Sequence, residues 1–139
     1  MKIAHISDLH LDATFKKENI KKTMHLLEYI TDNKFDHIII SGDITENAET
    51  AAFELARNIF KRFGLFNSKK LSLVIGNHDV FGGVHLAEDV INFPAKCKTI
   101  DYNRKVKEFE YFFNETFDKT IKPLKTVSFH SLRNSTILS

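Results

Sequence analysis

The 139-residue sequence predicts an α/β fold with a parallel sheet, and two observations carry this prediction. Short apolar runs rich in β-branched residues alternate with segments whose apolar residues recur at helical spacing. This alternation gives the order β-α-β-α-β over the first two-thirds of the chain. Strands that are separated by helices pair in parallel through right-handed crossovers, so we expect one parallel sheet within a single domain, residues 1–139.

Three strands are expected, over residues 2–7, 37–40 and 71–75. Each is a short apolar run that is followed by polar residues. The second contains three consecutive isoleucines, a pattern typical of a strand that is buried on both faces, as in parallel sheets. We therefore expect other parts of the chain to pack against both faces of this strand.

The two segments between these strands have the apolar spacing of amphipathic helices. One face of the first, residues 18–33, carries Ile20, Met24, Leu27 and Ile30. In the second, residues 47–63, the repeating positions are Leu55, Ile59 and Phe63. Gly64 then suits the left-handed residue that commonly ends a helix.

The last third of the chain gives weaker signals. Gly82, Gly83 and Pro94 predict a long loop. A further amphipathic helix is expected over residues 101–117, and strand-like pieces follow over residues 124–139.

Composition excludes several classes of protein. Twenty Lys and Arg against 18 Asp and Glu leave a net charge of +2, without the strongly basic footprint of a nucleic-acid-binding domain. Cys97 is the one cysteine, so no internal disulfide can form, and a reducing compartment fits best. No apolar run reaches the length of a membrane helix, and charges interrupt the N-terminus too soon for a signal peptide. We expect a cytoplasmic protein that binds neither membranes nor nucleic acid.

Polar side chains gather where each expected strand ends. Asp8 and His10 follow the first strand, Asp43 follows the second, and Asn77 and His78 follow the third. Ligands bind outside the carboxyl ends of an open parallel sheet, so we expect the three clusters to converge. Asp8 and His10 are two residues apart, so on extended backbone their side chains should point in the same direction.

These residue types are chemically coherent. Carboxylate, imidazole and amide oxygen together suit a divalent ion such as manganese, iron or zinc. Taken separately, each cluster has an ordinary structural explanation, since an Asp after a strand often caps a helix and an Asn-His-Asp sequence suits a turn. Their recurrence at three successive strand ends instead favours a metal site.

The clusters resemble the first three motifs of the calcineurin-like metallophosphoesterases: Asp8-Leu9-His10, Gly42-Asp43-Ile44-Thr45-Glu46 and Gly76-Asn77-His78-Asp79. The resemblance covers roughly residues 1–80. The first eleven residues are also similar to the start of cyclic-nucleotide phosphodiesterases and repair-type nucleases of that superfamily. The family fold, an α-β-β-α sandwich, implies that the β-α-β-α-β order is one half of such a domain.

The resemblance implies a hydrolase with two divalent ions, Mn, Fe or Zn. Asp8 and His10 would hold the first ion, Asp43 would bridge both, and Asn77 would hold the second. His78 would face the phosphate, stabilise the developing charge and protonate the leaving oxygen, with Glu46 orienting it. A hydroxide bridging the ions would then attack a phosphodiester or phosphomonoester in line.

The family also has a later histidine and a Gly-His-x-His motif, and this sequence contains no Gly-His dipeptide. Only His85 and His130 follow His78. His130, in a plausible strand, is expected to be packed or solvated, and whether His85 lines the pocket stays open. We therefore expect an apparently truncated, N-terminal portion of the domain with an incomplete second metal site.

Two functions remain in competition. The chain is either a metal-dependent phosphoesterase, or a catalytically inactive fragment that acts at most as a metal-binding or interaction module. In the second case a partner or a missing C-terminal half would cover an exposed sheet face. A nucleic-acid binder has little support, because short lysine clusters occur routinely on solvated helix surfaces.

Overall fold

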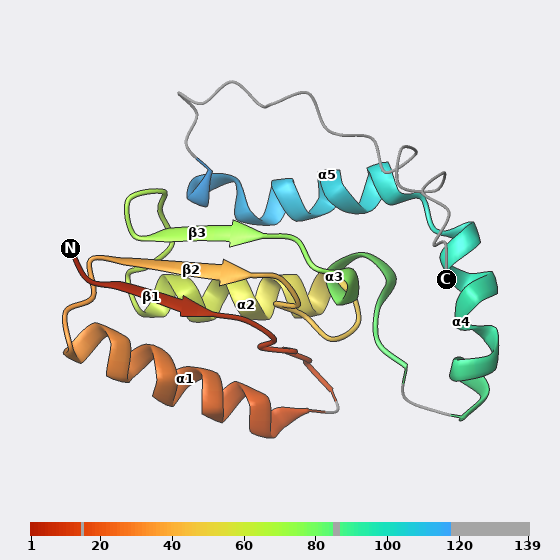
Figure 1. Cartoon of the computed structure of the whole chain (residues 1–139), viewed down its shortest axis with the longest axis horizontal. Helices are drawn as coiled ribbons and strands as arrows, with labels where there is room; N and C mark the ends of the chain where they lie inside the picture. Colours follow the sequence, from red (N-terminus) through yellow and green to blue (C-terminus); the bar gives the residue numbers. More distant parts are fainter. Residues whose placement is uncertain (15, 85–86, 118–139) are drawn as a thin grey trace, which may run out of the picture.

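A computed structural model describes residues 1–14, 16–84 and 87–117 and confirms the α/β prediction (Figure 1). The expected order is present as β1 (Ile3–Ile6), α1 (Lys17–Asp32), β2 (His37–Ser41), α2 (Thr50–Arg62) and β3 (Leu71–Val74). The chain continues through α3 (Asn77–Phe81), α4 (Ala87–Thr99), α5 (Tyr102–Phe113) and a 3-10 turn, η1 (Asn114–Thr116). The strand-like pieces expected over residues 124–139 lie outside the described residues.

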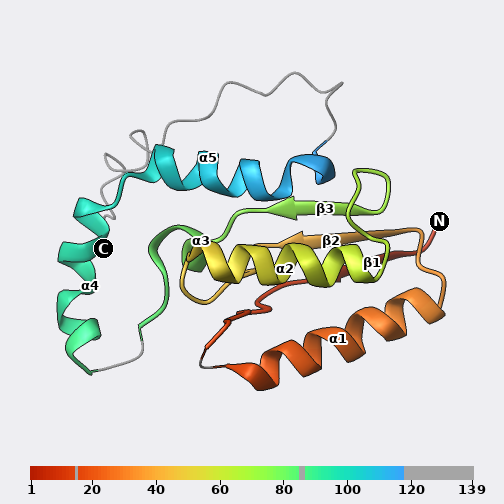
Figure 2. The same cartoon turned by 180° about the vertical axis from the view of Figure 1, so that it is seen from behind.

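The three strands form one parallel sheet in the order β1-β2-β3. Ile3 lies opposite His37, and Ile38 lies opposite Leu71. Because all three strands run in the same direction, their carboxyl ends meet at one edge of the sheet. This edge lies beside α3 (Figures 1 and 2).

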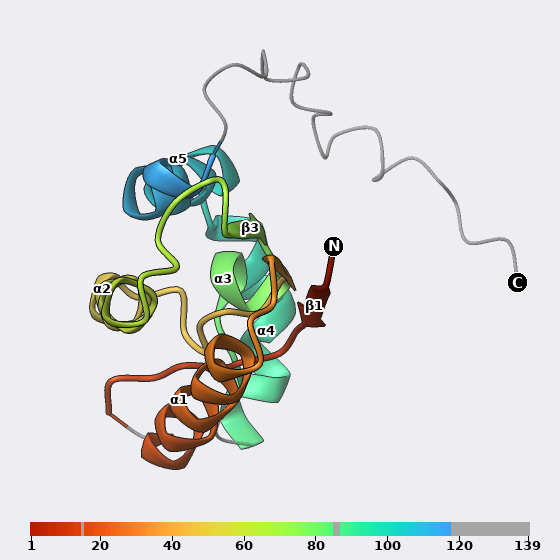
Figure 3. The same ribbon diagram turned by 90° about the vertical axis from the view of Figure 1, so that its left-hand side faces the viewer.

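One face of the sheet is covered by α1 and α2, as the view along the strands shows (Figure 3). Side chains on this face are buried, whereas Ile3, His5 and Val74 on the other face are exposed. Burial also alternates along β2, so the expectation of a strand buried on both faces is wrong. The run of isoleucines indicates an apolar strand, but the burial of each face depends on which other elements pack against it.

Phenylalanines from α2 and α5 form the centre of the core. The Phe53 ring stacks on Phe112 with centroids 5.7 Å apart and meets Phe113 edge-on at 6.0 Å. Phe109 lies 4.8 Å from Phe113. These contacts hold α5 against α2 and confirm the amphipathic helix expected in this region, which begins at an Asp101 cap that accepts a hydrogen bond from the Arg104 N–H.

We expect Phe53→Leu to lower the free energy of unfolding by about 1 kcal/mol, because the smaller side chain loses ring contacts but keeps the site apolar. Phe53 is fully buried. Urea denaturation measures the change. Tyr111→Leu, at a 70 % exposed ring on α5, serves as the control and should change stability by less than about 0.5 kcal/mol.

The long loop expected around Gly82, Gly83 and Pro94 is only partly correct. Gly82 does end α3 with a positive φ of 74°, but α4 follows and contains Pro94 within it. Acidic residues in the first turn of α4 and lysines in its last turn complement the helix dipole, which favours a helix despite the proline. None of the described helices has the length and apolar character needed to span a membrane.

Candidate metal centre

The loops that follow β1 and β2 are hydrogen-bonded to each other beyond the edge of the sheet. The backbone N–H of His10 donates to the Asp43 carbonyl at 3.0 Å, and that of Asp8 donates to the Gly42 carbonyl at 3.3 Å. An isolated parallel bridge between Leu11 and Thr45 continues this pairing. The first two sequence motifs are therefore held side by side by the backbone, before any side chain contributes.

The backbone is left-handed at three of the expected ligands. φ is 57° at Asp8, 46° at His10 and 52° at Asp43. The expectation that the first two lie on extended backbone is therefore wrong, because β1 ends at Ile6. Asp and His are among the non-glycine residues that tolerate this conformation best.

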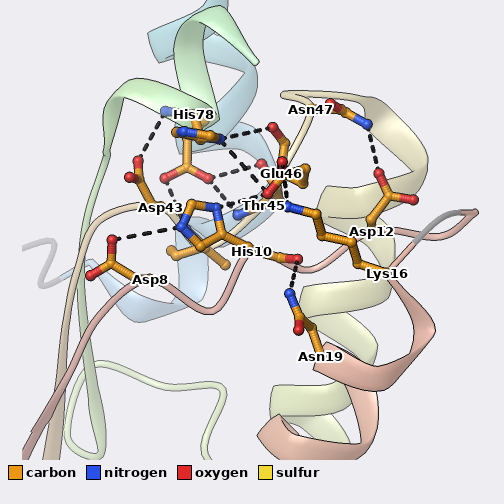
Figure 4. Close-up of polar contacts among 12 residues, drawn as sticks. Asp8, His10, Asp12, Lys16, Asn19, Asp43, Thr45, Glu46, Asn47 and His78 are labelled. Atoms are coloured by element: carbon orange, nitrogen blue, oxygen red, sulfur yellow. Dashed lines mark hydrogen bonds and ion pairs between the residues drawn. The ribbon is translucent and has the colours of Figure 1, made fainter. Parts of the chain in front are cut away.

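The left-handed turns nonetheless bring these three side chains together. Asp8, His10 and Asp43 each offer a ligand atom, and the three atoms lie within 4.8 Å of one another. The Nε2 atom of His10 faces the Asp8 carboxylate, 3.6 Å from Oδ1 (Figure 4). Two carboxylates and one imidazole form a donor set that fits a divalent first-row metal.

The third motif is brought against Asp43 by the turn after β3. The His78 backbone N–H donates to Asp43 Oδ1 at 2.9 Å. A Cβ atom on Gly76 would lie 2.2 Å from the Asp43 nitrogen and the same Oδ1, so this approach requires glycine. Asn77 is the first residue of α3 and is exposed, and its side chain makes no hydrogen bond to the described residues.

Asp79 joins the second and third motifs from beneath the site. Its fully buried carboxylate accepts hydrogen bonds at Oδ1 from the N–H and hydroxyl of Thr45, at 2.7 and 2.9 Å. Oδ2 accepts from the N–H groups of Gly76, at 2.9 Å, and Ile44, at 3.2 Å. Burial raises the pKa of this carboxyl above its ordinary value, and the four hydrogen bonds only partly oppose that effect.

Glu46 contacts two histidines and a lysine. Its side chain is only 3 % exposed, and Oε2 lies 2.9 Å from Nδ1 of His10 and 3.8 Å from Nδ1 of His78. Oε1 lies 2.7 Å from Nζ of Lys16 (Figure 4). The carboxylate that was expected to orient His78 thus lies closer to His10, while His78 Nδ1 faces the Glu46 backbone carbonyl at 3.2 Å.

His10 and His78 meet edge to face, with ring centroids 4.5 Å apart. Together with Glu46 they form a second group whose ligand atoms lie within 4.8 Å of one another. The two candidate groups share His10, so five of the six expected site residues, all except the exposed Asn77, form one continuous cluster. His85 and His130 lie outside the described residues.

Three residues of this region were not among the expected site residues. Asp12 is buried and accepts hydrogen bonds of 2.6 Å from the Thr14 N–H and from the Asn47 amide. Lys16 belongs to a short lysine cluster of the kind expected on a solvated helix surface, but it contacts Glu46. Asp79 is the last residue of the third motif, and the motif alone does not distinguish a structural role from a chemical one.

Comparison with curated proteins finds no match to the chain. Comparison with protein families matches residues 1–136 to the calcineurin-like phosphoesterases. The match is longer than the resemblance expected from the three motifs, which covers roughly residues 1–80. It agrees with the strand-end placement of those motifs and with the cluster of carboxylates and imidazoles. The chain therefore belongs to the calcineurin-like phosphoesterase family.

Proposed function

We propose that this chain is a metal-dependent phosphoesterase that hydrolyses a phosphodiester or a phosphomonoester. The observation that carries the proposal is the convergence of Asp8, His10 and Asp43 within 4.8 Å at the carboxyl edge of the sheet. Family membership supports the reaction class, because the family consists of metal-dependent phosphoester hydrolases.

The proposed ligands follow from these positions. Asp8 and His10 would hold a first divalent ion, and Asp43 would contribute one carboxylate oxygen to it and one to a second ion. Asn77, exposed at the start of α3, would supply its amide oxygen to that second ion. Manganese, iron and zinc all accept these donors. When bound, such ions lower the pKa of a coordinated water and neutralise charge on the phosphate oxygens.

His78 is the proposed proton donor to the leaving oxygen. A carbonyl oxygen can only accept a hydrogen bond, so the contact with the Glu46 carbonyl assigns the Nδ1 proton to that bond. Nε2 is then the atom that faces substrate and exchanges the proton. The backbone N–H of His78 also donates to Asp43 Oδ1, which keeps the proposed proton donor next to the proposed bridging carboxylate.

A non-catalytic module is the second candidate, and the exposed apolar residues on the sheet face opposite α1 and α2, within the described part of the chain, favour it. Ile3 is 43 % exposed and Val74 is 53 % exposed on that face. A partner that covered these residues would bury apolar surface without any need for turnover. Under this hypothesis the chain would bind one ion weakly and would hydrolyse nothing.

Metal dependence distinguishes the two candidates. The purified chain is stripped with a chelator and assayed with a chromogenic phosphodiester and a chromogenic phosphomonoester, with and without added Mn²⁺. We expect turnover of at least one substrate that appears with Mn²⁺ and disappears on chelation. Calorimetric titration with Mn²⁺ in the absence of substrate counts the sites. One weak site without turnover in a folded sample would contradict the enzyme proposal.

A further inference from the structure

We propose that His10, Glu46 and His78 form a separate zinc site whose occupancy inhibits the proposed hydrolysis. The proposed first catalytic ion would lie between Nε2 of His10 and the carboxylates of Asp8 and Asp43. The zinc site uses the other ring nitrogen of His10, Nδ1. Zinc binding itself does not depend on the proposed function. The inhibitory effect does rest on it, because that effect assumes that His10 is a ligand and that His78 is the proton donor.

The three zinc ligands come from the ends of three successive strands. His10 lies in the loop after β1, Glu46 in the loop after β2, and His78 in α3, after β3. Each offers a ligand atom within 4.8 Å of the other two (Figure 4). The first two loops are joined by backbone, since the Glu46 N–H donates to the Leu11 carbonyl at 3.0 Å. The fold therefore places this group together without any metal.

The contact between His10 and Glu46 has the geometry of two metal ligands and not of a hydrogen bond. Nδ1 of His10 is shielded from solvent and lies 2.9 Å from Oε2, yet it makes no hydrogen bond to the described residues. Nδ1 of His78 lies 3.8 Å from the same oxygen. Two atoms that share a tetrahedral zinc ion, each about 2.0–2.1 Å from it, lie about 3.3–3.4 Å apart. A shift of about half an ångström in each contact reaches this separation.

Glu46 can bind zinc while it keeps its other contacts. Lys16 approaches Oε1, with Nζ 2.7 Å away, and a Cβ atom on Gly83 would lie 2.6 Å from that same oxygen. The two imidazoles face the other oxygen, Oε2. An ionised carboxylate has about four lone-pair positions, so coordination at Oε2 is compatible with further partners of this side chain.

The donor set favours zinc over the other divalent ions. Two imidazoles and one glutamate carboxylate are an established set of zinc ligands, with a fourth position left for water. Manganese, magnesium and calcium are better suited by carboxylate, carbonyl and water oxygens. The group of Asp8, His10 and Asp43 has two carboxylates and one imidazole, so the two groups differ in the ion that they prefer.

Zinc at this site would remove both histidines from the proposed reaction. A neutral imidazole has one N–H and one lone pair. When Nδ1 of His78 binds zinc, its proton moves through water to Nε2 and the contact with the Glu46 carbonyl is lost. Nε2 then has no lone pair with which to exchange the proton of the reaction. In the same way, Nδ1 coordination of His10 leaves Nε2 protonated and unable to bind the first catalytic ion.

A double variant, Asp8→Asn with Asp43→Asn, separates the two groups. It removes both carboxylates of the proposed catalytic centre, and asparagine tolerates the left-handed backbone at each position. The zinc ligands are unchanged in this variant. Calorimetric titration of the metal-free protein with Zn²⁺ should show one site, and X-ray absorption at the zinc edge should show two imidazole ligands. Absence of zinc binding, or zinc held by fewer than two imidazoles, would overturn the proposal.

Glu46→Gln and His78→Gln, each added to the double variant, identify the ligands. Each should weaken zinc binding by more than about a hundredfold, beyond the usual cost of losing an outer-shell partner. Glu28→Gln, at an exposed acid in α1, is the matched control and should change the dissociation constant by less than about twofold. Circular dichroism establishes folding. The His78 side chain is 25 % exposed, so this variant decides the matter if loss of the buried Glu46 carboxylate prevents folding. Unchanged affinity in a folded site variant would contradict the proposal.

Inhibition is measured with the original chain at saturating Mn²⁺. Added Zn²⁺ should lower hydrolysis of the chromogenic substrate, and X-ray absorption of the same sample should show zinc bound by two imidazoles. Zinc bound by one imidazole would mean that it had replaced manganese beside Asp8 and Asp43, and would overturn the inhibitory role. If the original chain hydrolyses nothing with Mn²⁺, the proposed function fails, and the double variant alone decides whether the zinc site exists.

Discussion

Asp43→Asn is expected to reduce metal-dependent phosphoester hydrolysis by more than about a hundredfold, which exceeds the usual cost of losing an outer-shell partner. The asparagine tolerates the left-handed backbone at this position, where φ is 52°. Its Oδ1 can still accept the hydrogen bond from the His78 N–H. The substitution therefore removes the negative charge and one of the two oxygen donors while the surrounding loops keep their contacts.

Steady-state hydrolysis of the chromogenic substrate and calorimetric titration with Mn²⁺ measure the effect together. Asp43→Ala should lose activity equally, and comparison of the two variants separates the loss of a ligand from the loss of the His78 contact. Asp32→Asn, at an exposed acid in α1, is the control and should retain full activity. If Asp43→Asn kept full metal-dependent turnover, the assignment of this carboxylate to the metal centre would be wrong.

Asp79→Asn is expected to lower the free energy of unfolding by about 2–3 kcal/mol, although Asp79 is not a proposed ligand. Both carboxylate oxygens accept two hydrogen bonds, and three of the four donors are backbone N–H groups. An asparagine has one acceptor oxygen, so in either orientation its NH₂ group faces a backbone N–H. At least one buried donor then has no acceptor, and the junction between the loops of Thr45 and Gly76 loosens.

Urea denaturation, with the metal-free protein, measures this loss without contribution from ligand binding. The same Asp32→Asn variant serves as control, because it makes the identical chemical change on the surface and should shift stability by less than about 0.5 kcal/mol. Equal stability of Asp79→Asn and the original chain would mean that the buried hydrogen bonds of this carboxylate contribute nothing net to folding.

Most of the fold is predictable because it depends on local patterns. The apolar runs and helical spacings place β1, α1, β2, α2 and β3 correctly and in a parallel sheet. Boundaries shift where a loop residue adopts an unusual backbone. Helix α2 begins at Thr50 rather than near residue 47, since Ala48 is left-handed and its carbonyl accepts a hydrogen bond from Lys105 on α5.

Features that depend on other elements were not predictable in the same way. The isoleucines of β2 could not indicate that, among the described residues, one face of the sheet is more deeply buried than the other. In a parallel sheet the carboxyl ends of the strands meet at one edge. The proximity of Asp8, His10 and Asp43 could therefore be predicted from the sequence. The contact between Glu46 and Lys16 could not be predicted from the sequence, because Lys16 approaches from the start of another helix.

The left-handed turns at the proposed ligands also restrict which metals this centre can be adapted to bind. For most L-residues a positive φ costs about 1–2 kcal/mol, and β-branched side chains are worse still. Glycine fits the backbone but supplies no ligand, whereas Asp, Asn and His fit it and supply oxygen or imidazole donors. Exchange to thiolate ligands would pay the conformational cost at each of Asp8, His10 and Asp43. The shape of the loops thus disfavours conversion to the sulfur-rich sites that soft ions prefer, independently of any selection on the chemistry.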